Sequence, residues 1–207
     1  GKYQLSEIAD VVNAESKINN DVLIHTLVTD SRTFISPEGA LYFALTGIRH
    51  NGHSYIVDLY RRGIRNFIIS SKSEEFEKLT EANFLIVDDT IKALQKLAEH
   101  HRKQFEIPVI GITGSNGKTI IKEWLFQLMQ ATKKVARSPK SYNSQIGVPL
   151  SVWLLDEDHE IGIFEAGISE PDEMEKLQSI IQPTIGIFTN VGHAHDEGFI
   201  NYEQKAG

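Results

Sequence analysis

The sequence of 207 residues contains no cysteine. Disulfide bonds and thiol catalysis are therefore excluded, and the absence agrees with a reducing compartment. No apolar run approaches the roughly 20 residues that a membrane-spanning helix needs, and the first residues show no signal-peptide pattern. We therefore expect a cytoplasmic protein without a membrane-inserted segment.

Basic residues are also scarce. Lysine and arginine number 21 against 28 aspartate and glutamate residues, which gives a net charge of −7, and no basic run extends beyond Lys133-Lys134. This balance argues against nucleic acid as the main partner. Hydrophobic content of 41% and charged content of 24% are ordinary for a globular protein. The length suits one large or two small domains, each with its own core.

The most informative stretch is Ile107–Thr119, IPVIGITGSNGKT. Its first part is apolar and predicts a buried parallel strand. A glycine turn, Gly114–Thr119, follows, and then Ile120–Gln130 repeats apolar residues at helical spacing on one face, namely Ile121, Trp124, Leu125, Leu128 and Met129. A strand, a glycine turn with Lys-Thr, and a helix form an arrangement that holds a nucleotide phosphate chain. Lys118 would reach the β- and γ-phosphates, and the Thr119 hydroxyl would bind Mg²⁺.

The glycine spacing departs from the common phosphate-loop pattern. That pattern has a glycine five residues before the Gly-Lys pair, a position that Ile112 occupies here, while the glycines fall at Gly111 and Gly114. The alternative is a glycine-rich turn in which Thr119 only caps the helix. The flanking strand and amphipathic helix favour phosphate binding.

Strands and helices alternate along the rest of the chain, which predicts mostly parallel sheets. Asp89 is expected to cap a helix at Thr90–Gln104, and Ser6 to cap a helix at Leu5–Val12. The charged end of the Thr90–Gln104 helix, followed by Glu106 and Pro108, predicts a domain boundary. The first domain would cover residues 1–106, and the second would begin at residue 107. The other expected elements are strands around 22–24, 27–30, 40–45, 66–70, 84–87, 134–137, 160–164 and 184–190, and helices at 55–62 and 172–181.

Three strand ends carry residues suited to chemistry: the phosphate loop, Glu165, and Asn190–His195. The carboxyl ends of parallel strands meet at one edge of a sheet, so these groups should converge. Thr119 and Glu165 would supply oxygen ligands to Mg²⁺, whereas a histidine is a less typical ligand for that ion. The alternatives are that Glu165 caps the following turn and that His193 and His195 are ordinary loop histidines.

These motifs together resemble the Mur ligase family, ATP-dependent amide ligases that build the peptide of peptidoglycan on a UDP-sugar carrier. The resemblance covers nearly the whole chain. It rests on TGSNGKT, IGVPLS after Asn143, the strand end at Glu165, TNVGHAH, and, nearer the start, DSR at Asp30–Arg32, PEGALYFAL and the Gly47–His53 loop. It implies an N-terminal α/β domain that binds the UDP part, followed by the first part of a parallel-sheet ATPase domain of the phosphate-loop (P-loop) type at 107–207. The family's third domain would be absent.

Within the family, the run EAGISEPDEM from Glu165 is most similar to the member that adds D-alanyl-D-alanine to UDP-N-acetylmuramoyl-tripeptide in the bacterial cytoplasm. Ala166, where methionine is more usual, is a feature that suggests a subgroup fused to an alanine racemase. The folate-polyglutamate ligases share the phosphate loop, but the first domain does not resemble theirs.

The resemblance also assigns roles. The loop Gly114, Ser115, Asn116, Gly117, Lys118 and Thr119 would bind ATP. Thr119 and Glu165 would hold one Mg²⁺ and His195 a second, with Lys118, Glu165 and His195 as catalytic residues. Ser31, Arg32 and Asn143 would contact the substrate, although Ser144 stands where the family often has a second asparagine. Lys205 is a candidate for the family's carbamylated lysine, which would otherwise lie beyond residue 207, and His193 matches no family position.

The implied reaction passes through an acyl-phosphate, and the chain alone is expected to be inactive without the third domain. Two rival interpretations remain. One is a different phosphate-loop enzyme, which would bind ATP but no UDP-muramoyl peptide. The other is a non-catalytic UDP-sugar-binding module.

Overall fold

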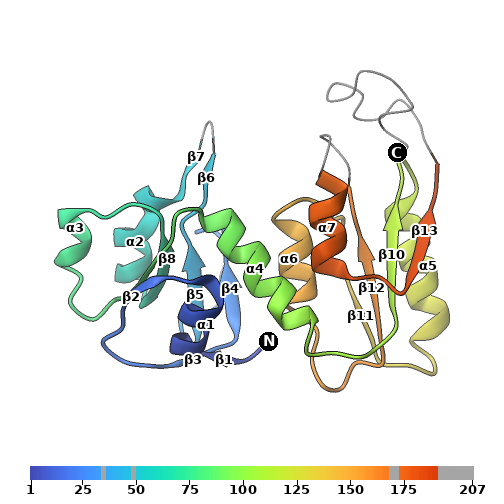
Figure 1. Cartoon of the computed structure of the whole chain (residues 1–207), viewed down its shortest axis with the longest axis horizontal. Helices are drawn as coiled ribbons and strands as arrows, with labels where there is room; N and C mark the ends of the chain where they lie inside the picture. The colour runs from blue at the N-terminus through green and yellow to red at the C-terminus, as the bar shows by residue number, and fades with distance from the viewer. Residues whose placement is uncertain (34–35, 48–49, 168–172, 191–207) are drawn as a thin grey trace. The chain divides into compact units, whose positions relative to one another are not determined.

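The computed structural model describes residues 1–33, 36–47, 50–167 and 173–190. It divides into two compact units, residues 1–97 and 98–207, each with its own sheet (Figure 1). The division falls inside α4 (Thr90–Arg102), and the boundary expected at residue 106 lies just beyond the end of the same helix. The predicted α/β class with parallel sheets is confirmed. In the described ranges, no helix has both the length and the hydrophobicity to cross a membrane.

The first unit is built on a five-stranded sheet with the order β2-β9-β8-β5-β4. All neighbouring pairs are parallel except β2 with β9. The strands are β2 (Glu15–Lys17), β4 (Thr26–Val28), β5 (Ala40–Phe43), β8 (Asn66–Ile69) and β9 (Asn83–Ile86). Two short antiparallel pairs accompany the sheet: β1 (Tyr3–Gln4) with β3 (Leu23–Ile24), and β6 (Thr46–Gly47) with β7 (His50–Asn51). The helices are α1 (Leu5–Val12), the 3₁₀ helix η1 (Gly52–Tyr55), α2 (Ile56–Arg61), α3 (Glu74–Glu77) and the first part of α4.

Both faces of this sheet are buried, as its short apolar strands predict. On one face, alternate strand residues such as Tyr42, Phe67 and Phe84 pack against Ile56 and Leu59 of α2. The residues that point to the opposite face are equally buried, namely Leu41, Phe43, Ile68 and Leu85. This two-sided burial explains why the strands appear in the sequence as continuous apolar runs rather than as an alternating pattern.

Of the two predicted helix caps, one is confirmed and the other is wrong. Asp89 caps α4 as expected, because its Oδ1 accepts hydrogen bonds from the backbone N–H groups of Ile91 and Lys92 at 2.9 and 3.0 Å. The prediction for Ser6 was wrong. The helix starts after Gln4, whose N–H is satisfied by Glu7, and the Ser6 hydroxyl instead donates to Asp21 at 2.6 Å. A long-range partner therefore replaced the local one.

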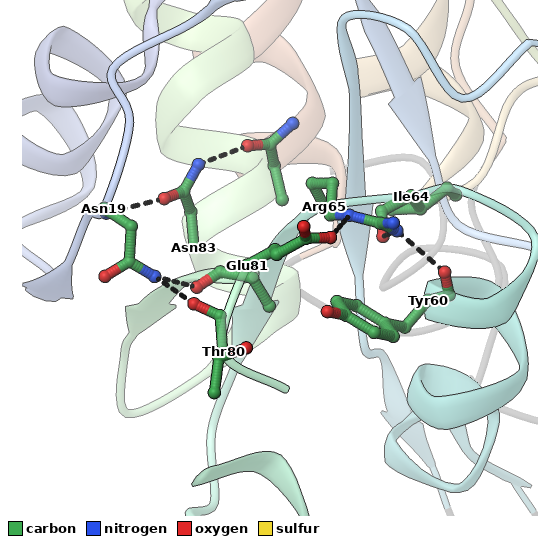
Figure 2. Close-up of polar contacts among 9 residues, drawn as sticks. Asn19, Tyr60, Ile64, Arg65, Thr80, Glu81 and Asn83 are labelled. Atoms are coloured by element: carbon green, nitrogen blue, oxygen red, sulfur yellow. Dashed lines mark hydrogen bonds and ion pairs between the residues drawn. The ribbon is translucent and has the colours of Figure 1, made fainter. Parts of the chain in front are cut away.

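A buried asparagine network ties the start of two strands to a preceding loop (Figure 2). The side-chain oxygen of Asn83 accepts from the N–H groups of Asn19 and Asn20 at 2.8 and 3.2 Å. Its amide nitrogen donates to the carbonyl of Asn20 and to the side chain of Asn66 at 2.9 and 2.8 Å. Asn66 in turn donates to the carbonyl of Ala40 at 3.0 Å. These bonds hold β5, β8 and β9 in register at the ends opposite their carboxyl ends.

The second unit has a four-stranded sheet of order β11-β12-β10-β13, and all its strands are parallel. The strands are β10 (Val109–Thr113), β11 (Val135–Arg137), β12 (Ile161–Glu165) and β13 (Ile185–Phe188). The helices are α5 (Lys118–Met129), α6 (Gly147–Val152) and α7 (Glu173–Ile181). Because β10 lies between β12 and β13, the chain reverses its winding direction beside β10, which is where doubly wound folds bind ligands.

Helices cover the two faces of this sheet unequally. Side chains of α6 and α7 pack with Val109 and Phe164 on one face. On the other face, Ile121, Leu125 and Met129 of α5 pack with Ile110, Ile112 and Ile163. The expected apolar face of α5 is therefore only partly buried, because Trp124 and Leu128 are 63% and 76% exposed. The helix is rotated so that a lysine, Lys122, takes a fully buried position instead.

A histidine and an arginine at the end of α4, His101 and Arg102, are buried in the second unit. Arg102 donates to the carbonyls of Ile181 and Gln182 at 2.8 and 3.1 Å, and so satisfies the C-terminal end of α7. A hydrogen bond of 2.9 Å joins Nε2 of His101 to the carbonyl of Leu155. Burial lowers the pKa of His101 to about 4, so the ring is neutral at pH 7.

Candidate active site

The alternation of side chains along β12 places Glu165 beneath helix α5. Ile161 and Ile163 point to the α5 face of the sheet, and Glu165, two residues further on, shares that face. The register pairs Glu165 with Ile112, one residue before the end of β10. A fully buried carboxylate therefore lies beside the start of the phosphate loop.

Two glycines give the loop its shape. Gly114 and Gly117 have φ angles of +125° and +82°, in the region that residues with a β-carbon rarely adopt. Gly117 is the residue before α5, so the loop delivers the chain directly into the helix N-terminus. Backbone N–H groups at such a terminus bind anions. The strand, glycine turn and helix predicted from the sequence are confirmed.

The end of β13 closes the loop from the other side. The N–H groups of Ser115 and Asn116 donate to the carbonyl and the side-chain oxygen of Asn190 at 2.9 and 3.0 Å. The Thr189 hydroxyl donates to the carbonyl of Asn116 at 2.6 Å. The predicted convergence of strand ends is thus seen for the loop, Glu165 and Asn190.

Lys118 lies in the first turn of α5, and its ammonium group donates to the carbonyl of Gly114 at 2.6 Å. The Lys118 side chain thus folds back over the glycine loop that precedes it in the sequence. Burial lowers the pKa of this ammonium, and the Glu165 carboxylate opposes that effect. A cation at this position can move to the terminal phosphates of a nucleotide bound in the loop.

Thr119 and Glu165 meet directly, since the Thr119 hydroxyl donates to Oε2 of the carboxylate at 3.0 Å. The other carboxylate oxygen, Oε1, is also buried and lies 2.9 Å from the Lys122 ammonium group. A carboxylate beside a hydroxyl is the kind of oxygen donor set that a hard divalent cation prefers. The described residues contain no group of three or more histidine, cysteine, aspartate or glutamate side chains that would hold a metal alone. A cation here would complete its shell with phosphate oxygens and water.

Lys122 is the functional candidate that the sequence reasoning missed. Its ammonium group lies 2.9 Å from Oε1 of Glu165, and both side chains are completely buried. It also contacts Glu123 at 3.3 Å and the backbone carbonyl of Lys140. The available signal was the position of Lys122 three residues after Thr119 and four after Lys118, which places the three on adjacent parts of one helix face.

Asn143 lies near the same edge of the sheet. Its carbonyl accepts from the N–H of Gly167 at 2.7 Å, two residues after Glu165. A β-carbon on Gly167 would come within 2.9 Å of the Asn143 side-chain oxygen, so glycine is needed for this close approach. These contacts place Asn143 beside Gly167, and its role in binding substrate stays a prediction.

In the first unit, Ser31 and Arg32 follow the carboxyl end of β4. Arg32 forms a two-point contact with Asp30, through Nε and Nη2 at 2.9 and 2.7 Å. Hydrogen bonds from Arg32 lower the pKa of Asp30 to about 2. The Ser31 carbonyl accepts from Arg62 at 2.7 Å. The Arg32 side chain is 85% exposed, so the guanidinium is accessible to a ligand.

Several predicted residues lie outside the described part of the chain. They are His193, His195 and Lys205, together with Arg49 of the Gly47–His53 loop and the expected helix start at 171–172. The metal and catalytic roles of His195 therefore stay predictions.

A doubly wound parallel sheet with a glycine loop, a Lys-Thr pair and a buried glutamate at the switch point is the arrangement of the phosphate-loop class of proteins. Residues 112–206 match the Mur ligase middle domain, and residues 23–102 match the Mur ligase family catalytic domain. The chain belongs to the Mur ligase family.

Curated relatives point to one branch of that family. The chain is 36% identical over 180 residues to a UDP-N-acetylmuramoyl-tripeptide–D-alanyl-D-alanine ligase of Synechocystis, a match covering 87% of this chain and 39% of the relative. It is 32% identical over 173 residues to the ligase of that name from Bacillus subtilis, covering 84% and 37%. The chain thus spans well under half the length of these relatives.

Two solved MurF structures are also similar to this chain. MurF from Acinetobacter baumannii superimposes with a TM-score of 0.89 and 25% identity, over 100% of this chain and 45% of that one. MurF from Thermotoga maritima, crystallised in complex with ADP, gives a TM-score of 0.74 and 29% identity over 87% and 40%.

Proposed function

We propose that this chain forms the UDP-substrate unit and much of the ATP-binding unit of a ligase that joins D-alanyl-D-alanine to UDP-N-acetylmuramoyl-tripeptide. The observation that carries the proposal is the pairing of Thr119 with Glu165 beside a loop built on two left-handed glycines. The names of the curated relatives support the substrate assignment. The ADP complex of the Thermotoga relative supports the nucleotide.

The proposed reaction has two steps. The γ-phosphoryl group of ATP passes to the terminal carboxylate of the tripeptide and forms an acyl-phosphate. The unprotonated amine of D-alanyl-D-alanine then attacks the acyl carbon, and inorganic phosphate leaves as the amide forms. Both steps depend mainly on positioning and on neutralising phosphate charge.

In this proposal the described residues would supply these functions. The loop N–H groups and the α5 N-terminus would hold the phosphates, and Lys118 would neutralise charge on the group being transferred. Thr119 and Glu165 would hold Mg²⁺, and their hydroxyl and carboxylate oxygens, which lie 3.0 Å apart, fit such an ion. Bound there, Mg²⁺ would offset the negative charge of the β- and γ-phosphates. The proposal also gives His195 the second metal role that the family resemblance implies.

The substrate's UDP part would bind the first unit near Arg32. Its exposed guanidinium suits a diphosphate, since arginine binds phosphate oxygens in two-point fashion. Nearby, His50 and Tyr55 stack with ring centroids 5.7 Å apart and offer a flat surface for a base. The location expected for the enzyme is the bacterial cytoplasm.

A thermal-shift titration of the chain tests this function with three separate ligands: UDP, UDP-N-acetylmuramoyl-tripeptide and Mg·ATP. A ligand at 100 times its Kd stabilises the folded state by about 2.7 kcal/mol. We expect the tripeptide nucleotide to stabilise more than UDP does. Stabilisation by Mg·ATP alone would instead indicate a different phosphate-loop enzyme, and stabilisation by the UDP ligands alone would indicate a UDP-sugar-binding module.

A further inference from the structure

Lys122 is buried too deeply to contact a nucleotide. None of its side chain is exposed, and its ammonium group already contacts three oxygens, from Glu165, Glu123 and the backbone of Lys140. Lys118, one turn earlier, is the lysine that faces the loop. Lys122 therefore acts on protein groups, and Glu165 is the fully buried ion among them.

The two carboxylate oxygens of Glu165 have different interaction partners. Oε2 accepts from the Thr119 hydroxyl at 3.0 Å, and Oε1 lies 2.9 Å from the Lys122 ammonium. The backbone N–H of Glu165 donates to the buried Ser138 hydroxyl at 3.1 Å. With its backbone and both oxygens held, the carboxylate has one orientation about its terminal torsion, which is otherwise broad.

We propose that Lys122 is a positioning residue that holds Oε1 of Glu165, so that Oε2 stays beside Thr119 where a divalent cation binds. The inference rests on the proposed function, because it assigns Lys122 a role in that metal site. Glu123 extends the arrangement, since it contacts Lys122 and forms an ion pair with Arg137, which lies over the ring of Phe126 at 3.7 Å. A second carboxylate thereby helps to anchor Lys122.

The test measures nucleotide binding rather than turnover. In the full-length protein, ADP affinity is determined by calorimetry in EDTA and across a Mg²⁺ titration for wild type, K122M, E165Q and K122M/E165Q. Loss of a partner that orients a metal ligand typically costs 10–100-fold in metal affinity. We expect K122M to raise the half-saturating Mg²⁺ concentration by about tenfold or more on this basis, with ADP affinity in EDTA changed less than about threefold.

The double variant separates positioning from other roles and guards against misfolding. K122M leaves a buried carboxylate without its cation, which lowers the unfolding temperature, whereas K122M/E165Q removes both charges and should recover much of the loss. Because Lys122 acts through Glu165, adding K122M to E165Q should change the Mg²⁺ response less than about threefold. K134M is the matched control, since Lys134 lies on the surface of the same unit and pairs with Asp158 at 3.3 Å.

Clear outcomes overturn the inference. An unchanged Mg²⁺ response in folded K122M would do so, and so would a stronger one, because removing a positive charge by itself favours cation binding. An additional loss of tenfold or more on adding K122M to E165Q would show that Lys122 acts independently of Glu165. If wild type binds ADP with no response to Mg²⁺, the proposed metal site fails, which is a different result from a wild-type response that K122M leaves intact.

Discussion

The hydroxyl oxygen of Thr189 lies 2.1 Å from the position that a β-carbon on Gly114 would occupy. Gly114 also has a φ angle of +125°, so a side chain there would be strained and would collide with the strand end that closes the loop. The Thr189 hydroxyl is held by its bond to the Asn116 carbonyl and cannot simply move away. The loop therefore depends on glycine at this position.

Gly114→Ala should consequently weaken ATP binding by about 5- to 150-fold, since strain of this kind costs about 1–3 kcal/mol. Calorimetric titration with ATP measures the change. Gly186→Ala is the matched control, because a β-carbon there meets nothing within 4 Å. Equal ATP affinities for Gly114→Ala and wild type would contradict the role of this glycine.

Lys118→Met should lower the turnover of the full-length ligase by about two to three orders of magnitude, comparable to the loss of one charge-stabilising group in other active sites. The variant keeps the aliphatic part of the side chain and removes only the charge that would neutralise the transferring phosphoryl group. Phosphate release in the presence of both substrates measures turnover. Lys133→Met, at an exposed surface pair with Glu160, serves as the control. Near-normal turnover of Lys118→Met would remove Lys118 from the mechanism.

His101 should make the folded state sensitive to acid. Its pKa of about 4 in the folded protein lies below the ordinary value of 6.5 for an exposed histidine. The unfolded chain therefore binds a proton first as pH falls, and stability present above pH 6.5 is lost between about 6.5 and 4, by up to about 1.4 kcal/mol per pH unit.

His101→Phe should flatten this dependence, although it also loses the bond to the Leu155 carbonyl. Urea unfolding at several pH values between 4 and 7.5 measures the free energy of unfolding of both proteins. The difference between the two curves isolates His101 from the other acid-sensitive groups, such as Asp30. Parallel curves over this range would contradict a buried neutral ring.

Asn83→Ala should destabilise the first unit by about 2–4 kcal/mol, because it removes four hydrogen bonds and leaves buried partners without acceptors or donors. Thermal unfolding, followed by circular dichroism, measures the loss. Thr80→Ala is the control, since Thr80 contributes only its backbone carbonyl to the network through Asn19 (Figure 2). A loss no larger than that of Thr80→Ala would show that the network contributes little.

Much of the fold was readable in the sequence because the signals were local. The strand, glycine turn and helix at Ile107–Met129 follow from apolar runs and glycines, and Asp89 caps α4 through neighbours two and three residues away. Ser6 shows the limit of such reasoning. Its hydroxyl binds Asp21, fifteen residues away, and no local rule indicates that choice.

The sequence by itself determined the phosphate loop, the alternation of strands and helices, and the family, because these depend on residue order and spacing. Only the tertiary structure decided how α5 is rotated on the sheet. That rotation leaves Trp124 and Leu128 exposed and buries Lys122 against Glu165. The physical reason is that a buried carboxylate needs a nearby cation, and the partner for Glu165 comes from a helix more than forty residues earlier in the chain.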